Sequence, residues 1–458
     1  MSTLIPDNLR DLAHEDLIEL ILQLAEDNRR LQAEIAELKK PPTNSRNSSQ
    51  PPSRDWKSNR PPRPKGKPRG AQAGHVKAER PLVENPDKVI DVRVTTCAHC
   101  GTDLSAVQPQ RMIRRQVTEL PEIKPVVIET RQEEVVCPCC QQLQQGPLPE
   151  GLEAMRQFGP RLEGLVTYFH HEHHMAFGRT PTVLQDVLGV SISEGGAVAI
   201  IERAGETAQP EAEAIGDRVR QSRVIGSDET SARVHGCNWW EWVFLSMDGE
   251  YHLIVPSRGQ DVIDAFMGDR RAEVWNSDCW KPQLNAPAGL HQLCIPHQIR
   301  NLQGLIDQRP RLQWAPEMQD LFRGAVHLWH RRDALTPAGF LGQVTRLENR
   351  LDKLLQRRMT GRVALNLLDR YRTHREHLFV FLHRPDVSPD NNACERALRP
   401  SVIHRKVMGS FRSEWGPRAY AALATVLNTA KRAGENVFQK LVSLMGKPIL
   451  HYLDPQTP

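Results

Sequence analysis

The sequence contains no long hydrophobic run. Across its 458 residues no stretch of about 18 or more apolar residues occurs, which excludes a membrane-spanning helix. The first residues, MSTLIPDNLRDLAHEDL, also lack the basic and then apolar segments of a secretory signal. We therefore expect a cytoplasmic protein that does not associate with a membrane.

Cysteine is scarce, and the nine cysteines cannot all pair in disulfides because their number is odd. Four of them form two CxxC pairs, Cys97 with Cys100 and Cys137 with Cys140. In a cytosolic chain this pattern indicates metal binding. Four thiolates suit one structural Zn²⁺, because they leave no ligand position open for water. Cys139 is an alternative to Cys140 as the fourth ligand, and a redox role for one pair is a further alternative that leaves the second pair unexplained.

Positive charge is concentrated in one segment of the chain. The net charge is +5, but residues 41–80 alone hold ten Lys and Arg against two acidic residues. The same segment has eight prolines and almost no apolar residues, so it cannot form a core, and we predict an extended linker. A basic segment of this kind favours nucleic acid as a partner, and it serves as a phosphate-binding arm, as a solvated tether, or as both.

Residues 9–40 predict a helix with a heptad pattern. Ile21, Asn28 and Ile35 occupy the a positions of the heptad. β-Branched residues at a with leucine at d favour a two-stranded parallel coil, and one Asn at a fixes its register. We therefore expect a homodimer or higher oligomer, while the alternative is an amphipathic helix packed on its own protein. The leucines at the d positions are Leu17, Leu24, Leu31 and Leu38.

Residues 81–145, which contain the CxxC pairs, predict a small zinc-binding β module with strands at 89–94, 126–130 and 133–136. Residues 155–215 predict helices. One helix ends at Gly189, and Ser191 or Ser193 caps the next, which indicates either a helix-turn-helix for DNA binding or an ordinary helical hairpin. A nearby histidine cluster is interpreted as a solvated or packed face rather than a metal site. Its members are His170, His171, His173 and His174.

From residue 222 the hydrophobic period changes to that of strands. Segments 222–236, 239–246 and 250–257 predict three antiparallel strands, with an Asp248-Gly249 hairpin turn. A short helix over 259–267 and two further strands follow, the last leading into a helix. This order is that of the ribonuclease-H-like fold, and we expect a catalytic core that begins with residues 222–310.

The carboxylates in this region predict a metal site. Asp228 lies on the first strand and Asp278 at the end of the fourth, and these strands are neighbours in the expected topology. Two facing carboxylates repel unless they share divalent cations such as Mg²⁺, and two such ions support phosphoryl transfer. Glu395 is the candidate third acid, with Asp390 as the competing choice, and Glu229 is expected on the opposite face of the strand.

The rest of the chain completes the predicted organisation. Residues 311–388 form a helical insertion, residues 389–436 contain the third acid and basic helices, and residues 437–458 are a C-terminal tail. The basic residues either bind DNA phosphates beside the site or lie on a solvated face. The strongest candidates for DNA contact are Arg405, Lys406 and Arg412. The fold class is therefore multidomain α+β.

The chain resembles a bacterial DDE transposase of insertion-sequence family sixty-six over nearly its whole length. The most specific motifs are SDET at 227–230 and DNNACERALRP at 390–400. The N-terminal coil, the NSRNSSQPPSRD linker, the CxxC pairs, FGPRLEGLVTYF and RTPTVLQDVLGVSIS are also similar, in the same order. The chain departs from the family pattern after the second acid, where Asp278-Cys279-Trp280 replaces a Gly and a nearby Tyr.

The resemblance implies the function of this chain. Asp228, Asp278 and Glu395 would be a metal-binding catalytic triad that uses two Mg²⁺, or Mn²⁺, to hydrolyse DNA at the element ends and join it to a target. His297 and Arg300, in CIPHQIRNL, would support the site. The resemblance also implies accessory proteins encoded by the same element and a nucleoid-associated location in a bacterium. The alternatives are a zinc-containing DNA-binding regulator without catalysis and a ribonuclease-H-like nuclease or resolvase.

Overall fold

The computed structural model describes residues 14–38, 75, 80–149, 152, 156–447 and 449. Helix α1 spans His14–Leu38, within the segment predicted as a coil. The predicted linker at 41–80 lies outside the described residues, apart from positions 75 and 80. None of the described helices has the length and apolar character needed to cross a membrane.

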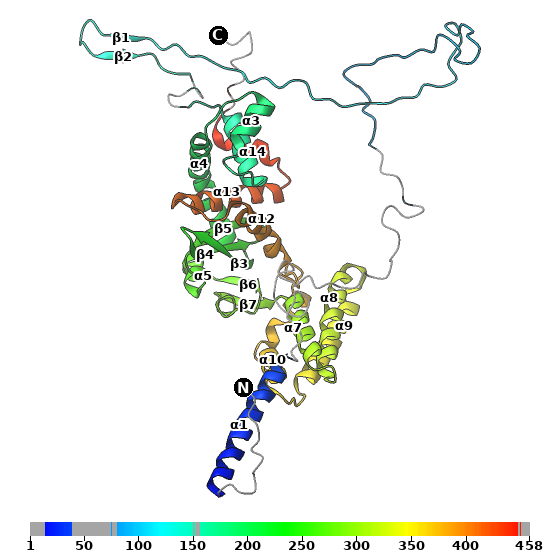
Figure 1. The fold of residues 1–458 in the computed structure, drawn as a ribbon, viewed down its shortest axis with the longest axis vertical. Coiled ribbons are helices and arrows are strands. Elements are labelled where there is room, and N and C mark those ends of the chain that lie inside the picture. The colour runs from blue at the N-terminus through cyan, green and yellow to red at the C-terminus, as the bar shows by residue number, and fades with distance from the viewer. Residues whose placement is uncertain are drawn as a thin grey trace.

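A mixed five-stranded sheet forms the centre of the molecule (Figure 1). Its strand order is β5-β4-β3-β6-β7. Strands β3, β4 and β5 are antiparallel neighbours, while β6 runs parallel to β3 and β7 runs parallel to β6. The five strands occupy the segments whose alternating pattern predicted strands. They span Val224–Val234 (β3), Cys237–Leu245 (β4), Glu250–Val255 (β5), Ala272–Ser277 (β6) and Ala288–Leu293 (β7).

Helices cover both faces of the sheet. On one face Phe266, from α5 (Gln260–Met267), stacks on Phe244 of β4 with ring centroids 3.9 Å apart. On the other face, the backbone N–H of His252 in β5 donates to the hydroxyl of Thr425 in α13. Helix α12 packs on the same face, where Val243 is buried with Cys394, Ala397 and Leu398. Helices α12 and α13 span Asn392–Met408 and Trp415–Arg432.

The helical segment before the sheet shares the core of the sheet. Helix α4 (Glu194–Arg220) packs on α13 so closely that a Cβ at Gly205 would lie 2.2 Å from the Cβ of Ala419. Residues of α4 and of the sheet belong to one buried cluster. The segments 155–215 and 222–310, which were expected to be separate regions, therefore share a hydrophobic core. Helices α2 and α3 span Pro160–Thr167 and Thr180–Leu188, and a π-helix, η2, spans Tyr168–Glu172.

The segment predicted as a C-terminal tail begins with a helix, α14 (Val437–Met445). Leu441 and Met445 on this helix are buried in the core of the sheet, at 0% and 2% exposure. The α14 backbone also lies against α2, where a Cβ at Gly164 would come within 3.3 Å of the backbone nitrogen of Val442. The prediction of a tail was therefore wrong over α14, because an apolar helix face found a partner far away in sequence.

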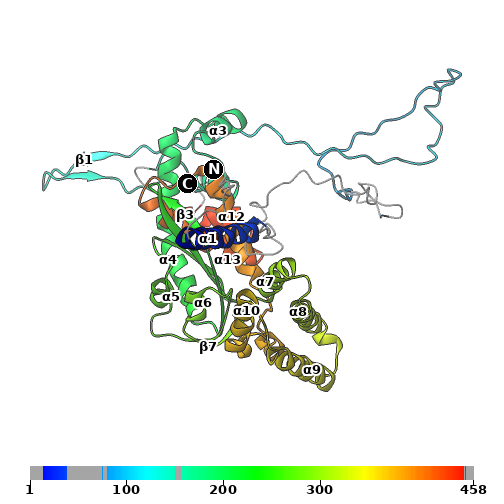
Figure 2. The ribbon, with the colours of Figure 1, turned by 60° about the horizontal axis from the view of Figure 1, so that its bottom comes forward.

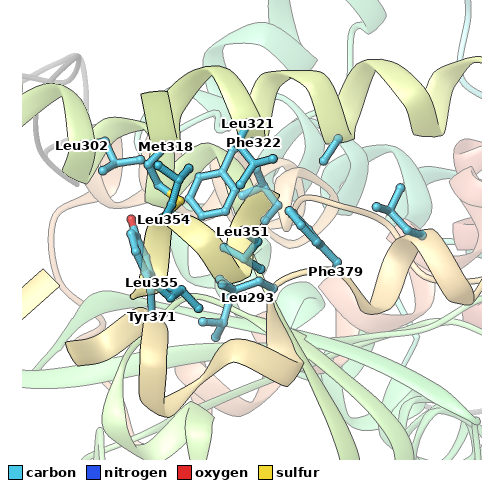
Figure 3. Close-up of a cluster of buried hydrophobic side chains, with 14 of the residues drawn as sticks. Leu293, Leu302, Met318, Leu321, Phe322, Leu351, Leu354, Leu355, Tyr371 and Phe379 are labelled. Carbon is cyan, nitrogen blue, oxygen red and sulfur yellow. The ribbon is translucent and has the colours of Figure 1, made fainter. Parts of the chain in front are cut away.

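The 116 residues between Asp278 and Glu395 contain a helical body beside β7 (Figure 2). Its core joins β7 and α7 to α8, α9 and α10 around Phe322 and Tyr371 (Figure 3). On α9 the side chains of Val344, Leu351 and Leu354 are buried, whereas Leu341 in the first turns is 58% exposed. The helices are α6 (Lys281–Leu284), α7 (Ile295–Gln308), α8 (Trp314–His330), α9 (Pro337–Leu355), α10 (Arg362–Thr373) and α11 (Val380–His383), with 3₁₀ turns η3 (Arg332–Ala334) and η4 (Arg375–His377).

The segment predicted as a β module contains one short hairpin. Strands β1 (Glu134–Val136) and β2 (Leu143–Gln145) pair antiparallel. The strands expected at 89–94 and 126–130 do not form. Their apolar side chains stay exposed, as at Val92 and Val127, which are 84% and 91% accessible. Strand preference depends on packing against neighbouring strands or helices. Segments with an alternating apolar pattern but without such packing therefore stay extended and do not pair in a sheet.

Candidate active site

Two of the predicted acids lie at matching places on neighbouring parallel strands. Gly226 of β3 is in register with Asn276 of β6. Asp228 and Asp278 each follow two residues later, Asp278 just beyond the end of β6. The parallel register therefore places the two carboxylates at the same edge of the sheet, as the sequence predicted.

Helix α12 brings Glu395 to this edge. Two asparagines attach the turn before the helix to the sheet: Asn276 donates to the backbone oxygens of Ser388 and Asp390, both at 3.0 Å. Asn391, 3% exposed, donates to the backbone oxygen of Ser227 at 2.8 Å. Glu395 then lies in the first turn of α12.

A glycine on β3 permits this close approach of α12. A Cβ at Gly226 would lie 3.0 Å from the Sγ of Cys394 and 3.4 Å from Oδ1 of Asn391. The helix therefore rests almost directly on the β3 backbone beside Asp228. Sequence reasoning missed Asn276, Gly226 and Asn391 as positioning residues, although the paired asparagines of the DNN motif were a visible signal.

The negative charges of the acids act on one another. Burial is the main cause that raises the pKa of Asp228 well above its ordinary value, and the charges of Glu229, Asp278 and Glu395 raise it further. Burial also raises the pKa of Asp278. The three predicted acids therefore share one electrostatic environment.

Glu229 points to the opposite face of β3 from Asp228, as expected from strand alternation. The amide of Gln283 donates to Glu229 at 2.9 Å, and Gln283 also accepts from Ser227, two residues earlier on the same face. Arg258 lies 2.8 Å from Glu229 and forms an ion pair with it. Burial and the charge of Asp278 nevertheless raise the pKa of Glu229.

His297 and Arg300 of α7 lie beside Glu395. Their Nε2 and Nη2 atoms are 3.8 Å and 3.7 Å from Oε1 of Glu395. Burial, assisted by the charge of Arg300, lowers the pKa of His297 to about 4, so the imidazole is neutral at neutral pH. Arg300 is therefore the cation that faces the Glu395 carboxylate.

The donor set suits a hard divalent cation in its chemistry, because its atoms are carboxylate oxygens. Besides burial, the charge of Asp278 raises the pKa of Asp228. The N–H of Trp280 and the charge of Arg258 partly offset the effect of burial on the pKa of Asp278. The side chains do not converge fully: within the described ranges no group of three or more His, Cys, Asp or Glu residues is placed to hold a metal ion. Glu395 instead faces Arg300.

A buried hydrogen-bonded network joins the sheet to α12 and α13, and sequence reasoning did not predict it. The ring of His252 lies between Glu241 and Glu250, with nitrogen–oxygen distances of 2.9 Å and 2.8 Å. Ser401 of α12 donates to Glu241 at 2.6 Å, and Asn428 of α13 donates to Glu250 at 2.8 Å. Burial alone would lower the pKa of His252, but the bonds of its ring to the Glu241 and Glu250 carboxylates raise it to about 9.

The three predicted DNA-binding residues follow Glu395 along α12 and the loop after it. Arg405 donates to the Ser231 hydroxyl at 3.0 Å, so it is engaged with β3, while Lys406 and Arg412 are exposed. Arg405 and Arg412 line a cavity of about 500 Å³ between α12, the end of β3 and the helices before the sheet. His170 and His171 also line it, and both are buried at 7% and 6% exposure, so this part of the histidine cluster is packed.

The two CxxC pairs fold into equivalent turns. The N–H of Cys97 donates to the Thr102 oxygen and the N–H of Cys137 donates to the Gln142 oxygen, both at 2.9 Å. The fifth residue of each turn, Gly101 or Gln141, has a positive φ, of 75° or 58°. Hydrogen bonds, first those from Thr102, lower the pKa of Cys100, and those from the N–H groups of Cys140 and Cys139 lower the pKa of Cys137. Lowered thiol pKa values suit metal ligands.

Comparison with known families places this chain. Residues 156–419, more than half of the chain, match the family model described as Transposase IS66 family. Residues 95–141, which include both CxxC turns, match the zinc-finger binding domain of transposase IS66. Residues 5–81 match a family of unknown function. A search of curated proteins found no match.

The fold and the matches define a transposase with a zinc-finger domain. The chain belongs to the Transposase IS66 family, and its function is transposition. The family implies use of a divalent metal, and the zinc-finger domain implies zinc binding and is consistent with DNA binding.

Proposed function

We propose that the chain catalyses metal-dependent phosphodiester hydrolysis and strand transfer at the ends of an insertion sequence, with Asp228, Asp278 and Glu395 as the catalytic acids. The observation that carries this proposal is the gathering of the three carboxylates. They come from β3, from the end of β6 and from the first turn of α12, and burial, together with the charges of Asp278 and Glu395, raises the pKa of Asp228. A DNA-binding regulator has no need of such an arrangement. The strand order β5-β4-β3-β6-β7 supports a ribonuclease-H-like core.

Each acid has a distinct support. The parallel register of β3 and β6 fixes Asp228 and Asp278, and Asn276 and Asn391 fix the start of the helix that carries Glu395. Two Mg²⁺ or Mn²⁺ ions held by the acids would activate the attacking oxygen and stabilise the leaving oxygen.

The reaction has two displacements at phosphorus. In the first, the oxygen of water bonds to the phosphorus at the element end, and the bond to the 3′ oxygen breaks. In the second, that freed 3′-hydroxyl attacks a phosphorus of the target DNA and releases a target 3′-hydroxyl. Arg300 and the neutral His297 hold the Glu395 carboxylate at this site.

The other segments supply DNA and partner binding in this proposal. Ser193 caps α4 by accepting from the Gly196 N–H at 3.0 Å, and Gly189 ends α3 in the left-handed conformation, which supports a helix-turn-helix. Together with Arg405, Lys406 and Arg412, this unit would contact element and target DNA. Accessory proteins of the same element would join the complex at the nucleoid.

Helix α1 is proposed as the dimerisation coil. It carries exposed apolar side chains that a second copy would cover. Among them are Ile18, Ile21, Leu22, Leu24 and Leu31, all at least 45% exposed.

One structural Zn²⁺ is proposed for the two CxxC turns. Their equivalence supports Cys140, the counterpart of Cys100, as the fourth ligand rather than Cys139.

The test is a cleavage and joining assay on duplex DNA that carries the element's own ends, with Mg²⁺ or with EDTA. We expect Mg²⁺-dependent cleaved and joined products from the unchanged chain. Asp228→Asn, Asp278→Asn and Glu395→Gln should bind the DNA and give no product. Asp390→Asn is the matched control, because Asp390 lies in the loop just before α12, where its carboxylate accepts from the Asn392 N–H.

The outcomes separate the candidate functions. Cleavage without joining would indicate a nuclease or resolvase. DNA binding without cleavage, with accessory proteins supplied, would indicate a regulator. Loss of activity in Asp390→Asn with retention of activity in Glu395→Gln would indicate that Asp390, and not Glu395, is the third acid.

A further inference from the structure

An exposed tryptophan stands beside the second acid. Trp280 is 40% exposed, and its backbone N–H donates to Oδ1 of Asp278 at 2.8 Å. The Asp278 carboxylate, which the proposed function assigns to metal binding, therefore fixes the backbone of Trp280. The large aromatic surface lies at the edge of the sheet where DNA has to approach.

Trp280 is one layer of a stack. The guanidinium carbon of Arg258 lies 4.4 Å from the centroid of the Trp280 ring and 4.6 Å from that of Trp240 on β4. The cation is thus in contact with both rings, an arrangement that stabilises each by cation–π attraction.

The stack has a rigid base. Arg258 forms an ion pair with Glu229, whose side chain is 3% exposed, and Gln283 donates to the same carboxylate. Gln283 is 1% exposed and also accepts from the ring N–H of Trp275. A chain of buried contacts therefore holds Arg258, and Arg258 in turn holds Trp280 in a fixed orientation.

The proposed chemistry has no use for this stack. Trp280 offers no metal ligand and no titratable group, and the fold keeps part of the ring in water rather than in a core. A planar ring fixed beside an acid that handles a DNA phosphate is suited to stack on a nucleobase. Bases within a duplex are already stacked on both sides, so the partner has to be an unpaired base.

We propose that Trp280, supported by Arg258 and Trp240, binds an unpaired base of the DNA strand next to the phosphate that is cleaved. This inference rests on the proposed function, since it assumes that Asp278 faces that phosphate. Stacking compensates for the loss of pairing and holds the strand in a distorted form at the acids. Trp280 is in this sense a positioning residue for the substrate.

The first experiment compares cleavage of two DNA duplexes by the unchanged chain, Trp280→Ala and Trp280→Phe. One duplex is fully paired, and the other has single mismatches placed in turn at the nucleotides that flank the cleaved phosphate. We expect Trp280→Ala to cleave the paired duplex about ten-fold more slowly, from the usual strength of base stacking on an aromatic residue. A mismatch at one position should restore most of this rate, and Trp280→Phe should lie between the other two.

A purely structural role for Trp280 predicts a different pattern. If the ring only supports Asp278, Trp280→Ala would slow both duplexes by the same factor. That result, or an unchanged rate on the paired duplex, would overturn the inference.

The second experiment does not depend on cleavage. Ca²⁺ replaces Mg²⁺, and 2-aminopurine occupies the mismatched position. Stacking on Trp280 should keep its fluorescence low in the complex with the unchanged chain, and Trp280→Ala should raise it. Equal fluorescence in the two complexes would refute base stacking. If the fluorescence differs but the unchanged chain does not cleave the DNA with Mg²⁺, the result counts against the proposed function and not against base stacking.

Discussion

The buried Glu241–His252–Glu250 triad predicts a pH-dependent contribution to stability. His252 is enclosed completely, and both carboxylates raise its pKa from 6.5 to about 9. Since the pKa is higher in the folded state, the stabilisation is fully present below about pH 6.5 and is lost as the pH rises through about 9. A rise of this size corresponds to about 3 kcal/mol, which is a substantial part of the stability of a typical domain.

The perturbation is His252→Gln. The amide can donate to one carboxylate and leaves the other buried and unpaired, so at about pH 6.5 the free energy of unfolding should fall by about 3–5 kcal/mol. At about pH 9.5 the unchanged protein has lost its own imidazolium, so the difference between the two proteins should shrink to about 1 kcal/mol. Urea unfolding followed by circular dichroism at both pH values measures this change.

A matched control comes from another buried histidine. Burial lowers the pKa of His291 to about 4, so this ring is neutral in the folded protein throughout the same pH interval. The stability difference between His291→Gln and the unchanged protein should therefore be the same at both pH values. If the difference for His252→Gln were also independent of pH, the ring would be neutral between its two carboxylates, and the reasoning would be refuted.

Three further predictions concern other parts of the chain. Gly205→Ala should lower the free energy of unfolding by about 1–3 kcal/mol, because its Cβ would lie 2.5 Å from the Cα of Ala419, and an unchanged urea midpoint would contradict the packing of α4 on α13. Cys137→Ser should abolish binding of the single Zn²⁺ measured by mass spectrometry of the native protein, whereas retention of a full equivalent would contradict a four-thiolate site. Asn28→Ile should stabilise the coil and broaden its oligomeric state in light scattering, whereas an unchanged monomer in both proteins would refute dimerisation through α1.

The five-stranded sheet was predictable because its sequence signals are local. Strand alternation and the Asp248-Gly249 turn locate β4 and β5, and the expected topology places Asp228 and Asp278 on neighbouring strands. Side-chain period alone also placed Glu229 on the opposite face from Asp228. These inferences need only the order of the strands and the alternation of side chains between the two faces of a strand.

The errors arose where the outcome depended on a distant partner. The valines of 89–94 have the same alternation as a real strand, but they are exposed among the residues that the structure describes. Helix α14 had no recognised role in the sequence because α2, against which it packs, lies far earlier in the chain, at Pro160–Thr167. Apolar period predicts which face is buried and does not identify what covers it.

The position of Glu395 shows why the third acid is harder to derive than the first two. Its place depends on contacts at the start and the middle of α12. Asn276 and Asn391 attach the start of the helix to β6 and β3, and Ser401 attaches its middle to the charged network on β4. All of these contacts join residues more than 110 positions apart. The pairing of the strands determines the position of a carboxylate on a strand. The position of a carboxylate on a helix depends on the tertiary contacts that hold the helix. The His252 network and the proposed catalytic acids therefore both depend on α12. We expect a pH high enough to neutralise His252 to loosen α12 and to reduce cleavage together with stability.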